Sequence, residues 1–94
     1  MRRIEPAGAF KRDLKREKKG RYRRIIEDEL WVVSGTLANN IPLALRYHDH
    51  PLHGEWEGSR ECHIRPDFLL VYTYEGDDWL ILERLGSHAE IFGL

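Results

Sequence analysis

The sequence lacks the features that mark secreted, membrane and repetitive proteins. Its single cysteine, Cys62, excludes an internal disulfide, which suits a reducing cytosol. No apolar run approaches the roughly 18 residues needed to cross a bilayer, and the first residues do not follow a signal-peptide pattern. There is no internal repeat and no low-complexity segment. With 94 residues, 41% of them hydrophobic, the chain is expected to form one small domain over residues 1–94 and to reside in the cytoplasm.

The chain also lacks an excess of charge of either sign, since its formal net charge is −1. This balance hides an asymmetry, because residues 1–24 hold eleven Lys or Arg against three carboxylates, a net charge of +8. Residues 25–94 hold four Arg against thirteen carboxylates, a net charge of −9. A basic segment on a neutral protein suggests an anionic partner such as nucleic acid, although a solvated helix face explains the charges equally well.

Two helices are expected in the first half of the chain. Residues 2–5 could form a short edge strand that ends at Pro6, which cannot continue a ladder. Residues 7–19 then predict a first helix rich in Lys and Arg, which Gly20 is suited to end. Residues 21–37 predict a second helix, so that the two form an αα-hairpin. The apolar stripe of the second helix is stronger and consists of Ile26, Leu30, Val33 and Leu37.

The second half of the chain predicts a sheet of strands joined by short loops. From Ser59 the polarity alternates, with His63 on the polar side of the strand. Residues 68–74 form a nearly continuous apolar run, typical of a central strand, and a turn at 75–78 joins it to a partner strand at 79–85. The fold class is therefore α+β, with an N-terminal helical hairpin packed on one face of a small antiparallel β-sheet.

Five side chains in the second half could transfer protons or hold phosphate. Histidine gives or takes a proton near pH 7, and the arginine fork suits phosphate oxygens. These side chains are expected at loops and strand ends, where a meander of strands would bring them within reach of one another. They are His50 in a rigid loop before Pro51, then His63, Asp67, Arg84 and His88.

A metal-independent ribonuclease site fits these residue types. RNA is cut by its own 2′-hydroxyl when a base takes the hydroxyl proton, an acid protonates the leaving 5′-oxygen and cations stabilise the phosphorane. Two histidines, a carboxylate and an arginine are a sufficient set. The same residues also fit ordinary roles, because Asp67 after Pro66 suits a plain turn. Arg84 could likewise pair with Glu83 or Glu61.

A metal site is the competing interpretation, because His48, His50 and His53 lie close together beside Asp49. The segment is not predicted to be helical, so its spacing does not place these side chains on one face. No Cys pair or second His pair completes the set, and we therefore expect no metal ion and no other cofactor. Cys62 falls on the core side of its strand and lacks an activating partner, which argues against a cysteine nucleophile.

Four segments, taken in register, resemble the YafQ-type branch of the RelE/ParE toxin superfamily. The resemblance covers nearly the whole chain, because the helical first half with its basic helix also fits. The segments are Tyr47-His48-Asp49-His50-Pro51-Leu52, Gly54-x-Trp56-x-Gly58-x-Arg60, His63-Ile64-x-Pro66-Asp67-Phe68-Leu69-Leu70-Val71-Tyr72 and Glu83-Arg84-x-Gly86-Ser87-His88-Ala89-x-x-Phe92-Gly93.

The resemblance implies a RelE-like microbial ribonuclease fold and a bacterial type II toxin that is paired with an antitoxin. Such toxins enter the ribosomal A site and cut the mRNA there. The family's catalytic residues would fall on His50, His63, Asp67 and His88, with Arg84 near the scissile phosphate. Phe92 would help to hold the mRNA, and the basic helix would face 16S ribosomal RNA through Lys11, Arg12, Lys15, Arg16, Lys18 and Lys19.

Two other interpretations stay open at this point. A toxin of the gyrase-inhibiting ParE-like branch would not need this set of histidines, and a toxin that only binds would have lost part of it. The presence of every candidate for proton transfer favours the ribonuclease.

Overall fold

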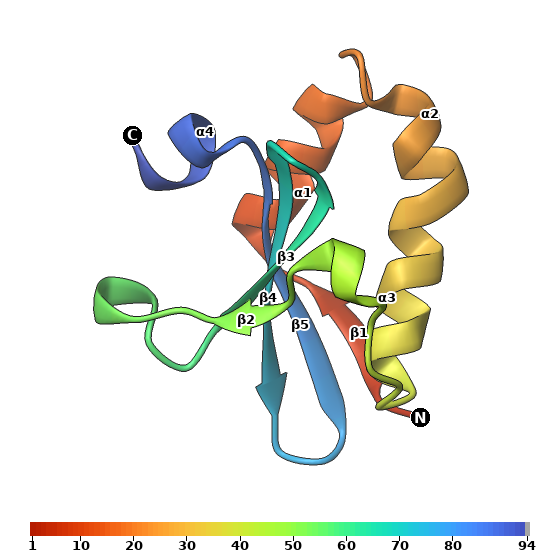
Figure 1. The fold of residues 1–94 in the computed structure, drawn as a ribbon, viewed down its shortest axis with the longest axis vertical. Coiled ribbons are helices and arrows are strands. Elements are labelled where there is room, and N and C mark those ends of the chain that lie inside the picture. Colours follow the sequence, from red (N-terminus) through yellow and green to blue (C-terminus); the bar gives the residue numbers. More distant parts are fainter. Residues whose placement is uncertain (94) are drawn as a thin grey trace.

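A five-stranded sheet forms the centre of the molecule in the computed structural model, which describes residues 1–93 (Figure 1). The strand order is β1-β5-β4-β3-β2, and β2 to β5 pair with antiparallel neighbours. This confirms the expected meander of the last three strands. The strands are β1 (Arg3–Pro6), β2 (His50–Pro51), β3 (Arg60–Arg65), β4 (Phe68–Glu75) and β5 (Trp79–Gly86).

The sheet is mixed, so the prediction of a purely antiparallel sheet is wrong. Strand β1 is parallel to β5, with Arg3 opposite Trp79 and Pro6 opposite Leu82. The pairing joins the two ends of the sequence, and a strand of four residues carries too little alternation to indicate a partner so far away. The α+β class itself is confirmed.

The helical part of the chain consists of α1 (Gly8–Glu17) and a second, longer helical segment. That second segment begins as α2 (Arg23–Ile25), widens into a π-helical stretch at Ile26–Leu30 and continues as α3 (Trp31–Ala38). Both lie within two residues of the expected helix limits. Within residues 1–93, none of the helices has the length and apolar character needed to span a membrane.

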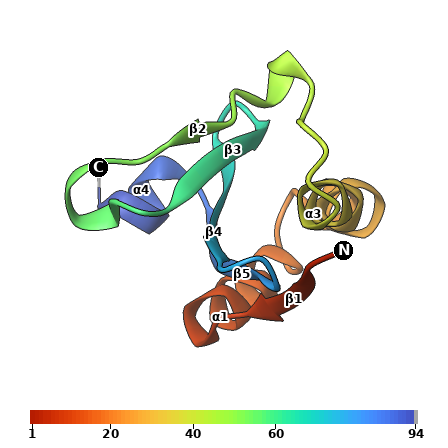
Figure 2. The ribbon, with the colours of Figure 1, turned by 90° about the horizontal axis from the view of Figure 1, so that it is seen from below.

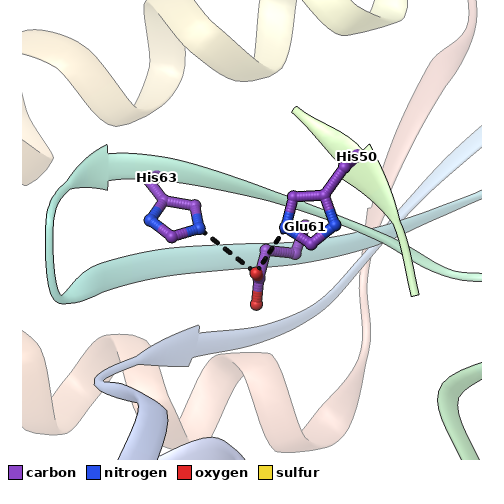
Figure 3. Close-up of side chains that lie close together, drawn as sticks. All are labelled: His50, Glu61 and His63. Atoms are coloured by element: carbon purple, nitrogen blue, oxygen red, sulfur yellow. Dashed lines mark hydrogen bonds and ion pairs between the residues drawn. The ribbon is translucent and has the colours of Figure 1, made fainter. Parts of the chain in front are cut away.

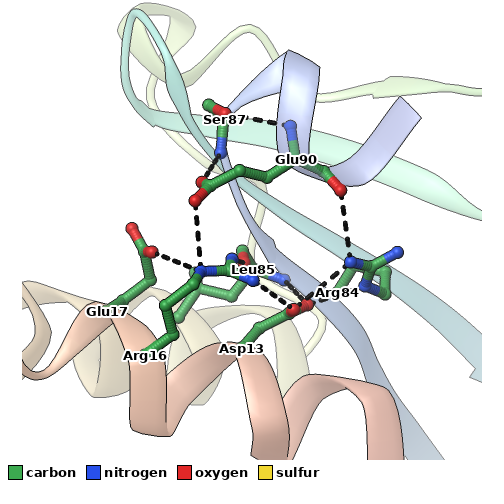
Figure 4. A network of polar contacts seen from close by, with 7 residues as sticks. All are labelled: Asp13, Arg16, Glu17, Arg84, Leu85, Ser87 and Glu90. Atoms are coloured by element: carbon green, nitrogen blue, oxygen red, sulfur yellow. Dashed lines mark hydrogen bonds and ion pairs between the residues drawn. The ribbon is translucent and has the colours of Figure 1, made fainter. Parts of the chain in front are cut away.

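The expected N-terminal helical hairpin is not confirmed, because the fold begins with β1, the edge strand expected near residues 2–5. Beyond the end of β1, Asp13 Oδ2 accepts a hydrogen bond from the backbone N–H of Leu85 at 2.9 Å. Arg16 Nη2 donates to the Leu85 carbonyl at 3.0 Å (Figure 4). Helix α1 therefore satisfies and covers the open edge of β5, which protects the sheet from pairing with other chains.

Strand β4 is buried on both faces, which explains its nearly continuous apolar sequence. On one face, Phe68, Leu70 and Tyr72 pack against the helices, including Leu30 and Leu37. On the other face Leu69 and Val71 pack against the short C-terminal helix α4 (His88–Phe92), with Leu52, Trp56 and Phe92 at the margin. Figure 2 shows α3 and α4 on opposite sides of β4.

Helix α4 is fixed at its start by a capping box. The Ser87 hydroxyl accepts from the Glu90 backbone N–H at 3.1 Å, and the Glu90 carboxylate accepts from the Ser87 N–H at 2.9 Å. Ile91 of the same helix is buried against the sheet. These contacts hold His88 at the first position of α4.

Candidate active site

The predicted catalytic histidines come together on the face of the sheet that α4 partly covers. Residues that pair across neighbouring strands point to the same face. Glu61 of β3 lies opposite both His50 of β2 and Val71 of β4, and His63 lies opposite Leu69. Because Leu69 and Val71 form the core beneath α4, Glu61 and His63 lie on that same face.

Glu61 joins two of the histidines (Figure 3). Its Oε2 atom lies 2.8 Å from His50 Nε2 and 3.2 Å from His63 Nε2. The carboxylate is only 4% exposed, and its Oε1 atom is buried and makes no hydrogen bond within residues 1–93. The sequence reasoning did not assign Glu61 to the site, although its position two residues before His63 on the polar side of the strand was the available signal.

The orientation of the His50 ring is fixed from both sides. Its Nδ1 atom lies 3.0 Å from the Pro51 carbonyl, which can only accept a hydrogen bond. When Nδ1–H donates to that carbonyl, the lone pair of neutral Nε2 faces the Glu61 carboxylate. The two facing acceptors can then share one proton, so the pair can take up positive charge.

His88 forms a second imidazole–carboxylate pair with Asp67. The two atoms His88 Nδ1 and Asp67 Oδ1 are 2.8 Å apart, and Oδ1 also accepts from the His88 backbone N–H at 3.0 Å. These hydrogen bonds from the backbone and side chain of His88 lower the pKa of Asp67 below its ordinary value. The contact orients the ring and leaves Nε2 free to face a substrate.

His63 lies between the other two histidines. Its ring centroid is 6.0 Å from that of His50 and 5.6 Å from that of His88. The three rings therefore form one row that crosses from β2 over β3 to α4. A pocket of about 630 Å³ opens at one end of the row, lined by Arg46, Tyr47, His48, His50, His63, Ile64, Arg65 and Pro66.

Arg84 lies on the same face as the histidine row, but its guanidinium hydrogen-bonds to residues outside that row. It is opposite Val71, which places it two strands away from Glu61, or about 10 Å at the usual strand spacing. Its Nε and Nη2 atoms donate to Asp13 Oδ2 and Oδ1 at 2.7 and 3.2 Å (Figure 4). Nη2 also donates to the Glu90 carbonyl at 3.4 Å.

Asp13 is the buried centre of that second network. Burial alone would raise the pKa of Asp13, but the hydrogen bonds from Arg84 and from the Leu85 N–H outweigh it and lower the pKa. Arg16 lies 3.1 Å from Asp13 and pairs with Glu90 of α4, also at 3.1 Å. The network therefore joins α1, β5 and α4, and sequence spacing gave no signal for it.

Asp49, which the sequence suggested only as a neighbour of a possible metal site, fixes the loop that carries His50. Asp49 Oδ1 accepts from the Tyr72 hydroxyl at 2.5 Å and from Arg60 Nε at 3.3 Å. His48 beside it has a left-handed backbone, and its ring meets that of His63 edge-on at 5.7 Å. Cys62 is buried in the core, where burial raises the pKa of its thiol, in agreement with the absence of a nucleophilic role.

The residues expected to contact RNA lie on two separate surfaces. Phe92 is half-buried beside the histidine row, where it meets Trp56 edge-on at 5.8 Å and His88 at 6.3 Å between ring centroids. Arg16 is largely engaged in ion pairs with acidic side chains. The other basic residues of α1 and its C-terminal end are exposed, namely Lys11, Arg12, Lys15, Lys18 and Lys19.

The chain is similar to known toxins over nearly its full length. A family model described as bacterial toxin of type II toxin–antitoxin system, YafQ, matches residues 2–93. The mRNA interferase toxin YafQ of Escherichia coli strain K12 is 40% identical over 93 residues, which cover 99% of this chain and 98% of that protein.

Two solved structures extend this similarity to the fold. The E. coli DinJ–YafQ complex has a chain with a TM-score of 0.83 and 39% identity, covering 99% of this chain and 100% of its own. A metal-bound toxin from Helicobacter pylori has a TM-score of 0.83 and 45% identity, covering 98% of this chain and 100% of its own.

Proposed function

The chain belongs to the YafQ family, the mRNA interferase toxins of type II toxin–antitoxin systems, and we propose that its row of histidines is the site that cuts RNA. The observation that carries this assignment is the row itself: His50, His63 and His88 come from three different elements and lie side by side. A carboxylate holds each ring, Glu61 for the first two and Asp67 for the third.

In the proposed reaction, His50 is the general base. Its Nε2 takes the proton of the RNA 2′-hydroxyl, whose oxygen then forms a bond to the adjacent phosphorus. The Glu61 carboxylate, 2.8 Å away, stabilises the imidazolium that results. His63 lies between base and acid, where its ring can donate a hydrogen bond to the phosphorane oxygens.

His88 is the general acid in this scheme. Asp67 accepts a hydrogen bond from Nδ1 of His88 and fixes the ring, so that Nε2 is placed to give a proton to the leaving 5′-oxygen. The bond from phosphorus to the 5′-oxygen breaks, and the products are a 2′,3′-cyclic phosphate and a 5′-hydroxyl. No metal ion or other cofactor takes part in these steps.

Arg84 and Phe92 complete the substrate site. Asp13 binds Arg84 through Nε and Nη2, whereas Nη1 makes no hydrogen bond within residues 1–93. We assign Nη1 to the phosphate next to the cut, where a fixed guanidinium stabilises developing charge. The half-buried Phe92 ring beside His88 offers a face on which a base of the mRNA can stack.

The basic surface of α1 fits the ribosome as the place of cleavage. Exposed Lys11, Lys15 and Lys18 belong to the segment of net charge +8. The negatively charged phosphate backbone of RNA attracts such a surface whatever the RNA sequence is. A histidine row that is open to solvent agrees with cleavage of mRNA that the large ribosome holds in its A site. An antitoxin partner, as in the E. coli DinJ–YafQ complex, would block this access.

The proposed function is tested by inducing the chain and mapping mRNA 5′ ends, with and without translating ribosomes. Cuts that follow the codon phase and require translation are expected, and His88→Gln should abolish them. Cuts in free RNA would overturn ribosome dependence. Intact mRNA with altered DNA supercoiling would instead identify a gyrase inhibitor and overturn the ribonuclease.

A further inference from the structure

The pocket at one end of the histidine row contains side chains that the reaction scheme does not use. Its volume of about 630 Å³ lies within the range of roughly 300–1,000 Å³ that is typical of small-molecule sites. His50 and His63 form part of its wall, whereas His88 and Phe92 do not. None of the side chains that line it within residues 1–93 is acidic. The pocket is therefore continuous with the His50 end of the row and suits an anionic ligand.

Arg65 offers hydrogen-bond donors to this pocket from a fixed position. Its Nη1 atom donates to Glu29 Oε1 at 2.9 Å and to the Ile64 carbonyl at 2.6 Å. Burial would raise the pKa of Glu29, but the hydrogen bonds from Tyr47 and Arg65 outweigh it and lower the pKa. Arg65 is 39% exposed, and its Nε and Nη2 atoms have no acceptor within residues 1–93. These two N–H groups can bind two oxygens of one phosphate.

The charges around Arg65 are not balanced. The carboxylate of Glu29 also lies 4.0 Å from the guanidinium of Arg46, which is 70% exposed and lines the same pocket. One carboxylate thus faces two guanidinium groups, so one positive charge in this network has no acidic partner. Because a phosphate carries the opposite charge, this corner of the pocket attracts it.

His48 adds an aromatic ring to the pocket. The residue is exposed, and its ring meets that of His63 edge-on with 5.7 Å between the centroids. Proteins that bind single-stranded RNA stack its bases on aromatic rings, including those of histidine. A base that packed on His48 would lie beside His63 and inside the pocket. The reaction scheme leaves this ring without any other role.

The direction of the RNA across the site follows from the roles of the histidines in the reaction scheme. The 2′-hydroxyl that His50 deprotonates belongs to the nucleotide on the 5′ side of the cut. The leaving 5′-oxygen at His88 belongs to the nucleotide on the 3′ side. Because the pocket adjoins His50 and the Phe92 ring adjoins His88, the two places take nucleotides from opposite sides of the cut.

We propose that the pocket binds the nucleotide immediately upstream of the cut, with its base against His48 and its 5′-phosphate on Arg65. This rests on the proposed function, because the role of His50 as base sets the direction of the RNA. His48 and Arg65 are positioning residues. They hold the upstream ribose so that its 2′-hydroxyl faces His50, and they take no part in proton transfer.

Binding in the pocket is tested without cleavage, by NMR of the histidine ring signals of the full chain during titration with adenosine 5′-monophosphate. This probe carries a base and a 5′-phosphate, as the upstream nucleotide does. The signals of His48 and His63 should shift along one binding curve, while His53, an exposed histidine outside the pocket, should not shift. Arg65→Gln should weaken binding by at least about tenfold, the effect of losing a hydrogen bond to a charged group. Unchanged His48 and His63 signals in the unaltered chain would overturn the proposal.

Further variants separate the phosphate contact from charge and from folding. Arg3→Gln is the matched control, because it removes an exposed arginine from β1, at the opposite edge of the sheet from β2, and it should bind normally. Arg65→Lys keeps the charge and should recover part of the binding, whether or not Arg65→Gln is folded by circular dichroism. His48→Asn suits the left-handed backbone at φ 46° and should weaken binding roughly 5- to 150-fold, the range for one base stack. Equal weakening by Arg3→Gln and Arg65→Gln would overturn the phosphate contact.

The direction of the RNA is tested by single-turnover cleavage of ribosome-bound mRNA that carries one abasic nucleotide. With the abasic nucleotide directly upstream of the cut, His48→Asn should add little to the loss, because the ring then has no base to contact. With the abasic nucleotide directly downstream, His48→Asn should keep its full effect. The reverse pattern would overturn the proposal. A chain that binds the nucleotide in the pocket yet cuts no ribosome-bound mRNA would overturn the proposed function and leave the pocket as a nucleotide site.

Discussion

Asp13 of α1 binds Arg84 of β5 through two hydrogen bonds, of 2.7 and 3.2 Å, although the two residues are 71 positions apart in the sequence. The same arginine reaches the Glu90 carbonyl at 3.4 Å, and Arg16 holds the Glu90 carboxylate at 3.1 Å. Helix α4, which carries His88, is thereby tied to the first helix of the chain. The position of the proposed general acid depends on a residue far outside the histidine row.

Asp13→Ala should therefore destabilise the fold. The carboxylate is 4% exposed, and its loss leaves Arg84 and the Leu85 N–H without their acceptor. Removing one partner of a buried pair costs about 3–5 kcal/mol, and the partial exposure of Arg84 favours the lower end of that range. The free energy of unfolding in urea measures the loss. Asp28→Ala, at an exposed position in the second helical segment, is the control and should change it by less than about 0.5 kcal/mol.

The same residue predicts how stability responds to acid. Because the pKa of Asp13 is lowered in the folded state, its contribution is complete above the ordinary pKa, about 3.9, and is lost as the pH falls through the lower folded value. Unfolding measured between pH 7 and pH 3 should therefore show a steeper loss for the unaltered chain than for Asp13→Asn. Parallel curves for the two chains would contradict the assignment.

The histidine row predicts a graded loss of cleavage. His88→Ala removes the proposed general acid and should slow single-turnover cleavage of ribosome-bound mRNA by about 10²–10⁴-fold. Asp67→Asn should give a smaller loss, because the amide oxygen can still accept from the His88 N–H and orient the ring, although it lacks the negative charge of the carboxylate. His53→Gln should cut at the normal rate. Equal rates for His88→Ala and the unaltered chain would remove His88 from the mechanism.

Local sequence patterns were sufficient to predict the sheet from β3 onward. The alternation around His63, the apolar run of β4 and the turn before Trp79 each extend over a few residues, so they can be recognised without knowledge of the tertiary structure. The capping box of Ser87 and Glu90 is local in the same way.

Contacts between distant segments could not be predicted in this way. The parallel pairing of β1 with β5 and the bonds of Asp13 to Arg84 join the two ends of the chain, and neither leaves a periodic trace. The part played by Glu61 depends on which residue of β2 lies opposite it, and a two-residue strand does not specify its register. The carboxylate that contacts His50 and His63 was therefore harder to predict than the histidines themselves.

Tyr72→Phe tests how the loop before β2 is held. The Tyr72 hydroxyl donates to Asp49 at 2.5 Å in a mostly buried setting, and a hydrogen bond to a charged group contributes about 1.5–3 kcal/mol. The variant should lose about that much stability and should also cut more slowly, since Asp49 precedes His50 directly. Tyr74→Phe, which removes only a 3.3 Å bond to the Leu37 carbonyl, should change both quantities much less. Normal cleavage by Tyr72→Phe would show that this anchor does not position His50.

We predict that the charges on α1 have two roles, with exposed lysines that contact RNA and one arginine that stabilises the fold. Lys11, Lys15 and Lys18 are exposed, whereas Arg16 is bound to acidic partners and to the Leu85 carbonyl. Changing the three lysines to glutamine should leave the free energy of unfolding nearly unchanged. It should weaken ribosome binding and flatten the plot of log affinity against log salt by roughly 0.7–0.9 for each phosphate that the helix no longer neutralises.

Arg16→Gln should show the opposite pattern, with lower stability and a salt slope close to normal, because its charge is already neutralised within the fold. Binding at two or more salt concentrations and urea unfolding on the same preparations distinguish the two effects. An unchanged salt slope in the triple lysine variant would show that α1 does not contact the ribosome. The basic first segment would then be a solvated helix face, and another surface of the toxin would have to bind the ribosome.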